Sequence, residues 1–248
     1  MSAVRRAVRA AGIEAPVLYE EVTESTNTIA LRLAEEGRPE WTLVAAGHQT
    51  EGKGRLGRTW LSSPGDALLF SFVLRPLLDA ERALLITLLA GASMAEACHA
   101  VSGRDVRCKW PNDLLLGDGK VGGILTEARV REGRVLHVVT GIGLNVHAAP
   151  SGVENAAALG SVDRYQLLTA FLRRFRERYS PADEGFASAV VSAYRLCSAT
   201  LGRWVRATVS DGRTVEGEAA DLDPIGNLVL RTHEGPATVA FGEVVHIR

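Results

Sequence analysis

Cysteine is scarce in this 248-residue sequence, which contains only Cys98, Cys108 and Cys197. An odd number of cysteines, with no two of them two residues apart, gives neither a disulfide framework nor the paired ligand spacing of a zinc site. The sequence therefore predicts no metal held by protein ligands. It also favours a reducing cytoplasm over an oxidising compartment.

The chain also lacks an excess of charge of either sign. Its 28 lysines and arginines nearly balance 29 aspartates and glutamates, for a net charge of −1, which argues against a protein that coats nucleic acid by bulk charge. The longest run without a charged residue or histidine, Ala83–Ala95, is shorter than the roughly 18–20 residues that cross a bilayer. The basic N-terminal residues lack the apolar stretch of a signal peptide. We therefore expect no membrane partner.

The chain length and the apolar content predict a globular protein with one large domain and one small domain. Hydrophobic residues make up 46% of the chain, near the globular average. Helical spacing of Ile29, Leu33 and Ala34 predicts a helix in TIALRLAEEG, which follows Ser25-Thr26-Asn27 and ends at Gly37. Strands are predicted at 42–47, 67–75, 106–110, 122–129 and 135–146, and helices at 81–101 and within 163–199.

The pattern changes near residues 199–201. Beyond that point, short β-rich runs alternate with Asp-Gly, Ile-Gly-Asn and Glu-Gly turns, which is typical of a small all-β barrel. We therefore divide the chain into domains 1–199 and 200–248. The larger domain mixes long helices with strand-turn-strand runs, which predicts an α+β sheet rather than alternating βαβ units.

Glycines and cations alternate in the first stretch that contains candidate functional residues, GHQTEGKGRLGRTW at 47–60. Its central residues are Gly52, Lys53, Gly54, Arg55, Gly57 and Arg58. Glycines let the backbone approach an anion, and arginine offers a bidentate fork to phosphate or carboxylate. The stretch fits neither the Walker spacing nor a Rossmann glycine turn. Alone it predicts an anion site, and a solvated basic loop is the alternative.

Two lysines, an amide and a carboxylate occur in the second stretch, CKWPNDLLLGDGKVGGILTE at 108–127. The Asp-Gly turn predicts a hairpin that brings together Lys109, Asn112, Asp113 and Lys120. Charged groups at such a place are costly to bury unless they have a partner or a ligand. The alternative is a surface hairpin with an exposed Lys109–Asp113 pair of little energetic value.

Two shorter stretches leave two interpretations each. In TGIGLNV, at 140–146, Gly141 and Gly143 interrupt an apolar strand that ends at Asn145. Glycine in a strand marks either the close approach of another group or a β-bulge. The second stretch is Ser25-Thr26-Asn27, which either caps a helix or presents polar groups to a ligand at the helix N-terminus.

These four stretches, in this order, resemble the biotin protein ligases. The matching segments are STN, GHQT with GKGRLGR and Trp60, KWPNDLLL with KVGGILTE, GIGLN, and the C-terminal FGEVVHIR. The resemblance extends from about Val22 to the end of the chain. It implies an α+β catalytic domain akin to the class II aminoacyl-tRNA synthetases, followed by a small SH3-like β-barrel.

The resemblance implies an enzyme that activates biotin with ATP, assisted by Mg²⁺, to biotinyl-5′-AMP. The biotinyl group then passes to a lysine of a biotin carboxyl carrier domain of acetyl-CoA carboxylase or a related acyl-CoA carboxylase. Only 24 residues precede Ser25, too few for the N-terminal DNA-binding domain of some relatives. We therefore expect a cytoplasmic short-form ligase without DNA binding, either monomeric or homodimeric.

The resemblance also assigns roles to residues. Biotin is expected at Ser25, Thr26, Asn27, Gln49, Lys53, Gly54, Arg55, Lys120, Gly123 and Gly141. ATP and the adenylate are expected at Arg55, Arg58, Trp60, Lys109, Asn112, Lys120 and Asn145, with Gly122 and Gly143 also lining the pocket. Arg55, Lys120 and Asp113 are the expected catalytic residues. Lys53 replaces an arginine that is common in the family, so the planar fork is lost there.

Two other functions remain as alternatives. One is a lipoate–protein ligase, which uses the same adenylation chemistry. The other is a biotin- or adenylate-binding regulator without ligase activity, which would not need both Arg55 and Lys120. We further expect the glycine-rich loop to become ordered when biotin binds.

Overall fold

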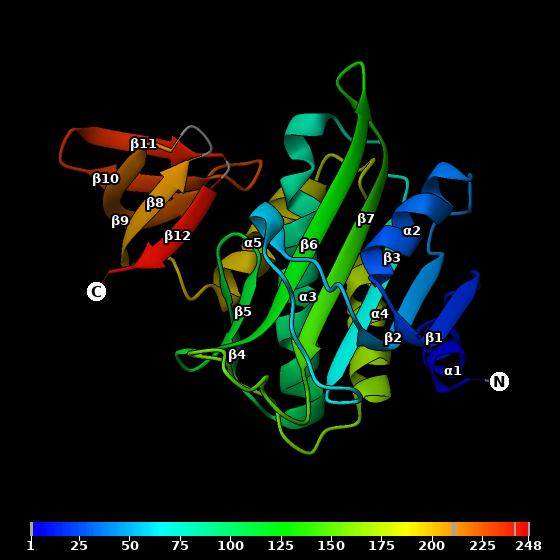
Figure 1. Ribbon diagram of the computed structural model, residues 1–248. Coiled ribbons are helices and arrows are strands. Elements are labelled where there is room, and N and C mark those ends of the chain that lie inside the picture. Colours follow the sequence, from blue (N-terminus) through cyan, green and yellow to red (C-terminus); the bar gives the residue numbers. More distant parts are fainter. Residues whose placement is uncertain (1, 210–211, 241, 248) are drawn as a thin grey trace.

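The computed structural model describes residues 2–209, 212–240 and 242–247. Within them the chain forms a seven-stranded mixed sheet covered by helices and a separate five-stranded antiparallel sheet (Figure 1). The helices are α1 (Ala3–Ala10), α2 (Thr26–Glu35), α3 (Leu84–Ser102), α4 (Arg164–Arg178) and α5 (Phe186–Cys197), with short 3₁₀ turns η1 (Arg55–Gly57) and η2 (Ala80–Arg82).

The large sheet has the strand order β1-β2-β3-β7-β6-β5-β4. Its strands are β1 (Val17–Thr23), β2 (Leu43–Gln49), β3 (Ala67–Leu74), β4 (Val106–Lys109), β5 (Asp113–Leu116), β6 (Gly119–Arg131) and β7 (Arg134–Asn145). The strands β1 and β2 are parallel and are joined by α2, whereas the other neighbours are antiparallel. The sheet therefore contains one βαβ unit, β1-α2-β2, at its N-terminal edge, and it is not built from alternating βαβ units.

The two faces of the large sheet are covered by different helices. On one face, Val44 and Val73 pack with Ile29 of α2. On the other face, the rings of Phe72 and Phe171 stand 6.0 Å apart, next to α3 and α4. Figure 1 shows α2 in front of the sheet and α3, α4 and α5 behind it. Because α2 covers mainly β2, β3 and β7, part of the front face remains for the glycine-rich loop.

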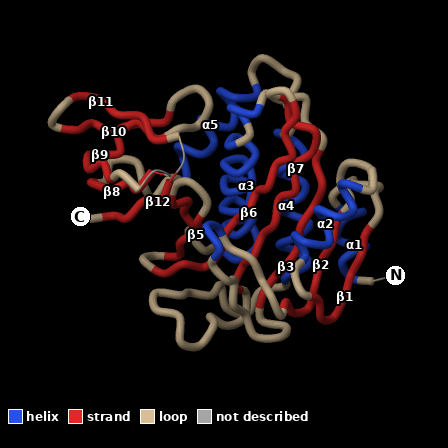
Figure 2. The backbone as a smooth tube through the Cα atoms, turned by 45° about the horizontal axis from the view of Figure 1, so that its top comes forward, coloured by secondary structure: helices blue, strands red, loops and turns tan. Residues whose placement is uncertain are grey.

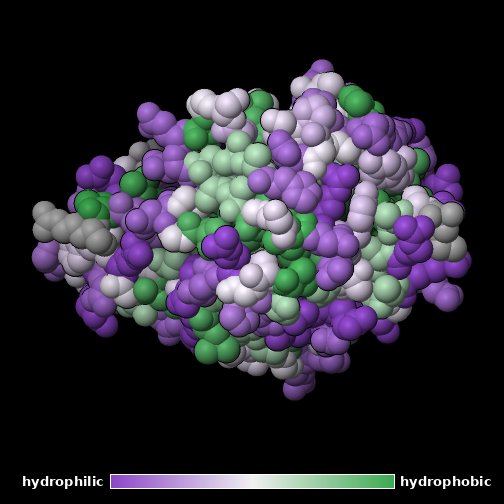
Figure 3. All heavy atoms as spheres, turned by 90° about the horizontal axis from the view of Figure 1, so that it is seen from below, coloured by the Kyte–Doolittle hydropathy of each residue, from purple (hydrophilic) through white to green (hydrophobic). Residues whose placement is uncertain are grey.

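The helix α3 is the central apolar helix of the large unit. Together with η2 it spans Ala80–Ser102, long and apolar enough by length and composition alone to cross a membrane. This segment is longer than the uncharged run 83–95 because it includes charged residues on both sides of that run. Nevertheless, 72% of its most apolar window is buried against the rest of the protein. Figure 3 shows a face on which hydrophilic residues predominate and hydrophobic residues form small areas.

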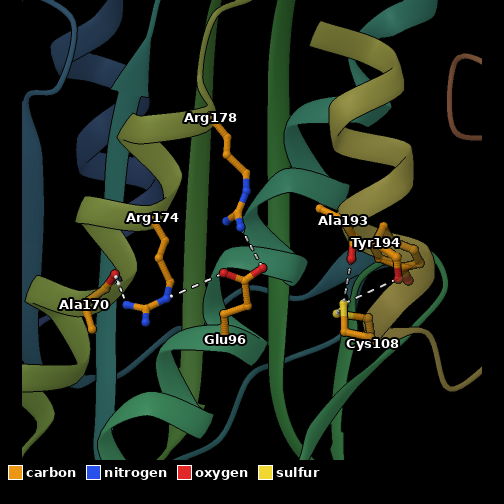
Figure 4. A network of polar contacts seen from close by, with 8 residues as sticks. Glu96, Cys108, Ala170, Arg174, Arg178, Ala193 and Tyr194 are labelled. Atoms are coloured by element: carbon orange, nitrogen blue, oxygen red, sulfur yellow. Dashed lines mark hydrogen bonds and ion pairs between the residues drawn. The ribbon is translucent and has the colours of Figure 1, made fainter. Parts of the chain in front are cut away.

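Polar contacts tie α3 and α5 to their neighbours (Figure 4). Glu96 of α3 lies between Arg178 and Arg174 of α4, at 2.9 and 3.6 Å. At the end of α5, the thiol of Cys197 lies 3.5 Å from that of Cys108 in β4. The three cysteines are free, and burial raises the pKa of Cys98 to about 12. These thiols therefore belong to the packing of the interior.

The second sheet has the order β11-β10-β9-β8-β12 and lies on the β5 side of the large sheet (Figure 2). Its strands are β8 (Trp204–Val209), β9 (Thr214–Leu222), β10 (Leu228–Thr232), β11 (Gly235–Val239) and β12 (Gly242–His246). Trp110 joins the two units: its Nε1 donates to the Gly226 carbonyl at 3.0 Å, and its backbone N–H donates to Thr200 at 2.9 Å. The peptide bond between Trp110 and Pro111 is cis.

Candidate active site

A cavity of about 260 Å³ opens on the same face of the large sheet as α2. Four segments predicted from the sequence meet there, although they are distant along the chain. The predicted residues that line it are Ser25, Thr26, Asn27, Gln49, Lys53, Gly54, Arg55, Arg58, Trp60, Lys109, Asn112, Asp113, Lys120, Gly123, Gly141 and Gly143. The structure therefore brings nearly all of the predicted polar residues to one place.

Two predicted residues lie outside this lining. Asn145 is 2% exposed, and its side-chain amide donates to the Ala157 carbonyl at 3.0 Å. Gly122 faces the apolar interior, where an added Cβ would come 2.9 Å from a Leu144 methyl group. Asn145 thus supports the loop after β7, and its contact with nucleotide remains a prediction.

The floor of the cavity consists of glycines on β6 and β7. Side chains alternate between the faces of a strand, so Gly141 and Gly143 lie on the same face as Val139, which packs beneath α2. A Cβ at Gly143 would come 2.8 Å from Nε1 of Trp60. One at Gly141 would lie 2.8 Å from Cγ of Asn27. Pairing is continuous at these positions, so close approach, not a β-bulge, explains both glycines.

Trp60 lies across Gly143 and Gly123. Its indole Nε1 is buried, and among residues 2–209, 212–240 and 242–247 it has no hydrogen-bond partner. A buried donor without an acceptor carries an energetic cost unless another group satisfies it. Trp60 therefore contributes an aromatic wall to the cavity, and its buried Nε1 lies against Gly143.

The glycine-rich loop is a folded hairpin over this floor. The N–H of Gly54 donates to the Arg58 carbonyl at 2.7 Å, and that of Trp60 donates to the Gly52 carbonyl at 2.8 Å. The turn η1 inside it has positive φ at Leu56 and Gly57. Figure 1 shows the loop passing in front of β6 and β7. A dependence of its order on biotin remains a prediction.

Lys120 and Asp113 form an ion pair at the wall of the cavity. Lys120 Nζ lies 2.6 Å from Asp113 Oδ1, across the β5–β6 hairpin. The side chain of Asp113 is 23% exposed and that of Lys120 41%. The predicted hairpin is confirmed, but Asp113 pairs with Lys120 and not with Lys109, its backbone partner in β4.

Arg55 is held from both structural units. Its Nη1 donates to Oδ1 of Asn112 at 2.9 Å, and its Nη2 donates to the Gly242 carbonyl at 3.2 Å. Burial lowers the pKa of Arg55, while the carboxylates of Asp113 and Glu243 raise it. A guanidinium remains protonated in proteins, so Arg55 brings a fixed positive charge to the cavity.

The second sheet completes the cavity, which the sequence did not predict. Glu243, Val244 and Val245 of β12 line it, and Glu243 forms an ion pair with Arg58 of the glycine-rich loop. Trp110 and Pro111 also contribute. The alternating pattern of β12 predicts a strand, but nothing local indicates which distant surface the strand contacts.

The start of α2 combines capping with ligand-facing groups. Ser25 stands at the N-cap position, but its side chain makes no capping bond within the part of the chain that the structure describes. Instead, Oε1 of Gln49 accepts from the Thr26 N–H at 2.7 Å. Gln49 thus caps the helix, and Ser25, which is 1% exposed, lines the cavity. Contact of these residues with a ligand remains a prediction.

A concave site with several cations above a glycine floor and a polar wall beside it defines a binding site for a small anionic ligand. Residues 19–145 match the Biotin/lipoate A/B protein ligase family, and residues 200–247 match the Biotin protein ligase C terminal domain. This chain belongs to the Biotin/lipoate A/B protein ligase family and is a biotin protein ligase.

Curated relatives agree with this assignment. The Bifunctional ligase/repressor BirA of Bacillus subtilis is 33% identical over 88% of this chain and 70% of its own length. The Biotin–[acetyl-CoA-carboxylase] ligase of Mycobacterium tuberculosis is 32% identical over 91% of this chain and 87% of its own length.

Solved structures show the same fold. A point mutant of the Aquifex aeolicus biotin protein ligase, in complex with biotin, matches with a TM-score of 0.78 and 28% identity, over 94% of this chain and 98% of its own. The Aquifex aeolicus enzyme in complex with biotin and ATP matches with a TM-score of 0.72 and 27% identity, over 94% and 99%. The mixed sheet and the separate antiparallel sheet are therefore those of a biotin protein ligase.

Proposed function

We propose that this protein activates biotin with ATP to biotinyl-5′-AMP and transfers the biotinyl group to a lysine of a biotin carboxyl carrier domain. One observation carries the proposal. Arg55, the Lys120–Asp113 pair and a polar wall of neutral side chains share a single cavity. Cations suit the reacting carboxylate and phosphate, and neutral donors and acceptors suit the uncharged ureido ring of biotin.

In the first step, a carboxylate oxygen of biotin attacks the α-phosphorus of ATP. The bond from that phosphorus to the bridging oxygen breaks, and pyrophosphate leaves. Both reactants are anionic and repel each other. Arg55 and Lys120 line the same cavity, so they lower this repulsion and stabilise the charge that develops on the phosphorane.

Magnesium enters this proposal as part of the nucleotide substrate. Among the described residues, no three His, Cys, Asp or Glu side chains group together as ligands. Mg²⁺ is commonly held by substrate phosphates and water, with only one or two carboxylates. This donor set therefore fits Mg²⁺ bound to the ATP phosphates rather than to a cage of protein ligands.

In the second step, the neutral amine of the acceptor lysine attacks the acyl carbon, and AMP leaves as the amide forms. The attacking nitrogen must lose a proton, and Asp113 is the carboxylate of the cavity that is paired with Lys120. This ion pair suggests a second role for Asp113, namely to hold the Lys120 ammonium beside the phosphate. The rates of adenylation and of transfer in the variant Asp113→Asn separate the two roles.

The polar wall at the start of α2 suits the ureido ring. Ser25, Thr26 and Gln49 present neutral oxygen and nitrogen atoms, and Trp60 adds an apolar surface. A cyclic urea has two N–H donors and one carbonyl acceptor, so such a wall can pair with all of them. Lys53, Gly54 and the floor glycines then lie along the valerate chain.

We further propose the finer fold and setting of this enzyme. Residues 1–199 form a catalytic domain akin to the class II aminoacyl-tRNA synthetases, and residues 200–248 form an SH3-like barrel. The partner is a carrier domain of acetyl-CoA carboxylase, the enzyme in the name of the Mycobacterium tuberculosis relative. A cytoplasmic location is proposed from the free cysteines. The choice between monomer and homodimer stays open, as does the prediction of no DNA binding.

The test is pyrophosphate release by the full chain with ATP and biotin, and separately with ATP and lipoate. The carrier domain is then added, and its mass is measured. Biotin-dependent pyrophosphate release and a mass gain of one biotinyl group are expected. Release with lipoate alone would indicate a lipoate ligase. Biotin binding without any pyrophosphate would indicate a regulator.

A further inference from the structure

A chain of hydrogen bonds runs beneath the polar wall of the cavity, and it begins at Glu127. Oε2 of Glu127 accepts from Nδ2 of Asn27 at 2.7 Å. The other end of the chain is the hydroxyl of Thr26, a residue that lines the cavity. Ser71 links the two, and it is fully buried. Glu127 does not line this cavity and was not predicted from the sequence.

The amide of Asn27 has one orientation that satisfies its neighbours. Its Nδ2 donates to the Glu127 carboxylate and also to the Leu125 carbonyl, at 3.3 Å. Both partners are acceptors, so a flipped amide would place its oxygen against two oxygens. Oδ1 of Asn27 must therefore face Ser71, at 2.6 Å.

This orientation of Asn27 determines where the hydroxyl proton of Ser71 points. A carbonyl oxygen cannot donate, so the hydroxyl of Ser71 donates its single proton to Oδ1 of Asn27. The Ser71 oxygen lies 2.8 Å from that of Thr26, and it can only accept there. The proton of Thr26 therefore goes to Ser71 or to Oε1 of Gln49, at 3.0 Å. In both cases Thr26 has only lone pairs left for the cavity.

Gln49 is oriented by the same logic. Its Oε1 accepts from the backbone N–H of Thr26 at 2.7 Å, and a flip would oppose two donors. Its Nε2 thus faces away from α2, and a Cβ added at Gly52 would lie 3.1 Å from it. The wall presents an acceptor at Thr26 beside a donor at Gln49.

We propose that Glu127 and Ser71 are positioning residues that fix the donor and acceptor polarity of this wall, and that the wall thereby selects a ligand with an N–H beside a carbonyl. This inference rests on the proposed function, because the cyclic urea of biotin has that arrangement. Glu127 acts through Asn27 and Ser71 and touches no ligand. Together with the Leu125 carbonyl, its carboxylate orients the amide of Asn27, and Asn27 in turn orients the hydroxyl of Ser71.

The test compares the dissociation constants of biotin and of two biotin analogues, in each of which one ureido N–H is replaced by a ring oxygen. The ring oxygen would face the lone pairs of Thr26. The wild-type chain is therefore expected to bind one analogue about tenfold or more weakly than biotin. In Ser71→Ala, only the longer contact with Gln49, at 3.0 Å, still holds the proton of the Thr26 hydroxyl. In Glu127→Ala, only the longer bond to the Leu125 carbonyl, at 3.3 Å, still orients Asn27. Both variants therefore weaken the orientation of the Thr26 hydroxyl. The ratio of the dissociation constant of the weaker-binding analogue to that of biotin is then expected to fall toward one.

Three comparisons make this result specific. Glu127→Gln keeps an acceptor for Asn27 and is expected to retain the wild-type ratio. Glu36→Ala, which removes an exposed ion pair with Arg32 at the other end of α2, serves as the matched control and is expected to retain it too. The dissociation constant of ATP should stay within about twofold in all variants.

A purely structural role of Glu127 and Ser71 would weaken biotin and its analogues equally. If the wild type binds and activates biotin but both alanine variants keep its ratio, this inference is wrong and the ligase assignment stands. If the wild type neither binds biotin nor releases pyrophosphate with it, both are overturned.

Discussion

The Lys120 ammonium and the Asp113 carboxylate face each other at 2.6 Å across the hairpin formed by β5 and β6. Asp113 holds the long lysine side chain in the cavity that Arg55 also lines, and Arg55 donates to Asn112, the residue before Asp113. The hairpin therefore carries a positioned cation at the wall of the cavity, next to a second cation that reaches it from the glycine-rich loop.

Lys120→Ala is expected to cripple adenylation, because it removes a cation from a site where two anions must meet. The loss of one preorganised electrostatic contact typically lowers the rate about 10²–10³-fold. The measurement is pyrophosphate release with saturating biotin and ATP. Arg131→Ala, on an exposed side chain of β6, is the control. Release within a few-fold of wild type by Lys120→Ala would contradict the proposed role.

Asp113→Asn separates the two roles of Asp113. If Asp113 only holds Lys120, the variant should slow pyrophosphate release. If Asp113 takes the proton of the acceptor lysine, adenylation should remain near the wild-type rate while transfer slows. Single-turnover transfer from preformed adenylate to the carrier domain distinguishes the two cases. An effect on neither step would remove Asp113 from the mechanism.

Arg55→Gly is expected to release biotinyl-5′-AMP. A hydrogen bond to a charged group contributes about 1.5–3 kcal/mol, which corresponds to one to two orders of magnitude in dissociation. The variant also loses the contacts from Arg55 to Asn112 and Gly242 that hold the loop. Freed adenylate acylates exposed lysines, so labelling of a bystander albumin should rise. Arg131→Gly is the control, and bystander labelling at its level, with adenylate still formed, would refute this role.

Gly143→Ala is expected to displace Trp60, because the new Cβ would lie 2.8 Å from the indole Nε1. Loss of an aromatic contact of about 1 kcal/mol should weaken ATP or adenylate binding by several-fold to tenfold. Titration calorimetry with a non-hydrolysable ATP analogue measures it. Gly185→Ala, where no atom lies within 4 Å of the added Cβ, should bind normally. Equal binding by both variants would show that Trp60 does not contact nucleotide.

Trp110→Phe is expected to destabilise the protein by about 1–3 kcal/mol, because the buried Gly226 carbonyl loses its donor. Urea denaturation measures the change. Trp204→Phe, on the second sheet, where the ring lies tilted against His233, is the matched control and should cost less. An equal or smaller loss for Trp110→Phe would mean that this hydrogen bond does not join the two units.

His246 predicts a pH dependence of stability. Burial, followed by the charges of Lys109 and Arg203, lowers the pKa of His246 to about 4, from an ordinary value of 6.5. Between these values the unfolded chain binds a proton that the folded chain does not, so the free energy of unfolding falls as the pH drops from 6.5 toward 4. His246→Gln should flatten this dependence in urea titrations at about pH 7, 6 and 5. Parallel curves for the variant and wild type would exclude His246 as the cause.

Elements with local signals were predicted correctly. The spacing of Ile29, Leu33 and Ala34 indicates α2, and the Asp-Gly turn at 118–119 indicates the β5–β6 hairpin. Each of these depends on contacts between residues that are close in sequence. Periodicity and turn chemistry therefore suffice to find them.

The strand β1 and its parallel pairing were missed because their cause is not local. As the edge strand of the large sheet, β1 is mostly half-buried or exposed, so its sequence lacks a clear apolar alternation. Its pairing with β2 requires α2 to cross between them. Only packing of α2 on Val44 and Val73 decides that arrangement.

The sequence by itself determined the chemistry of the site: which cations, amides and glycines are available, and in which turns they stand. Tertiary structure alone decided their partners. It paired Asp113 with Lys120 and turned the amide of Asn27 toward Glu127. It also placed β12 at the cavity, through the ion pair between Arg58 and Glu243. The reason is physical, because a hydrogen bond or ion pair depends on distance and direction in space, and the partners here come from strands far apart in the chain.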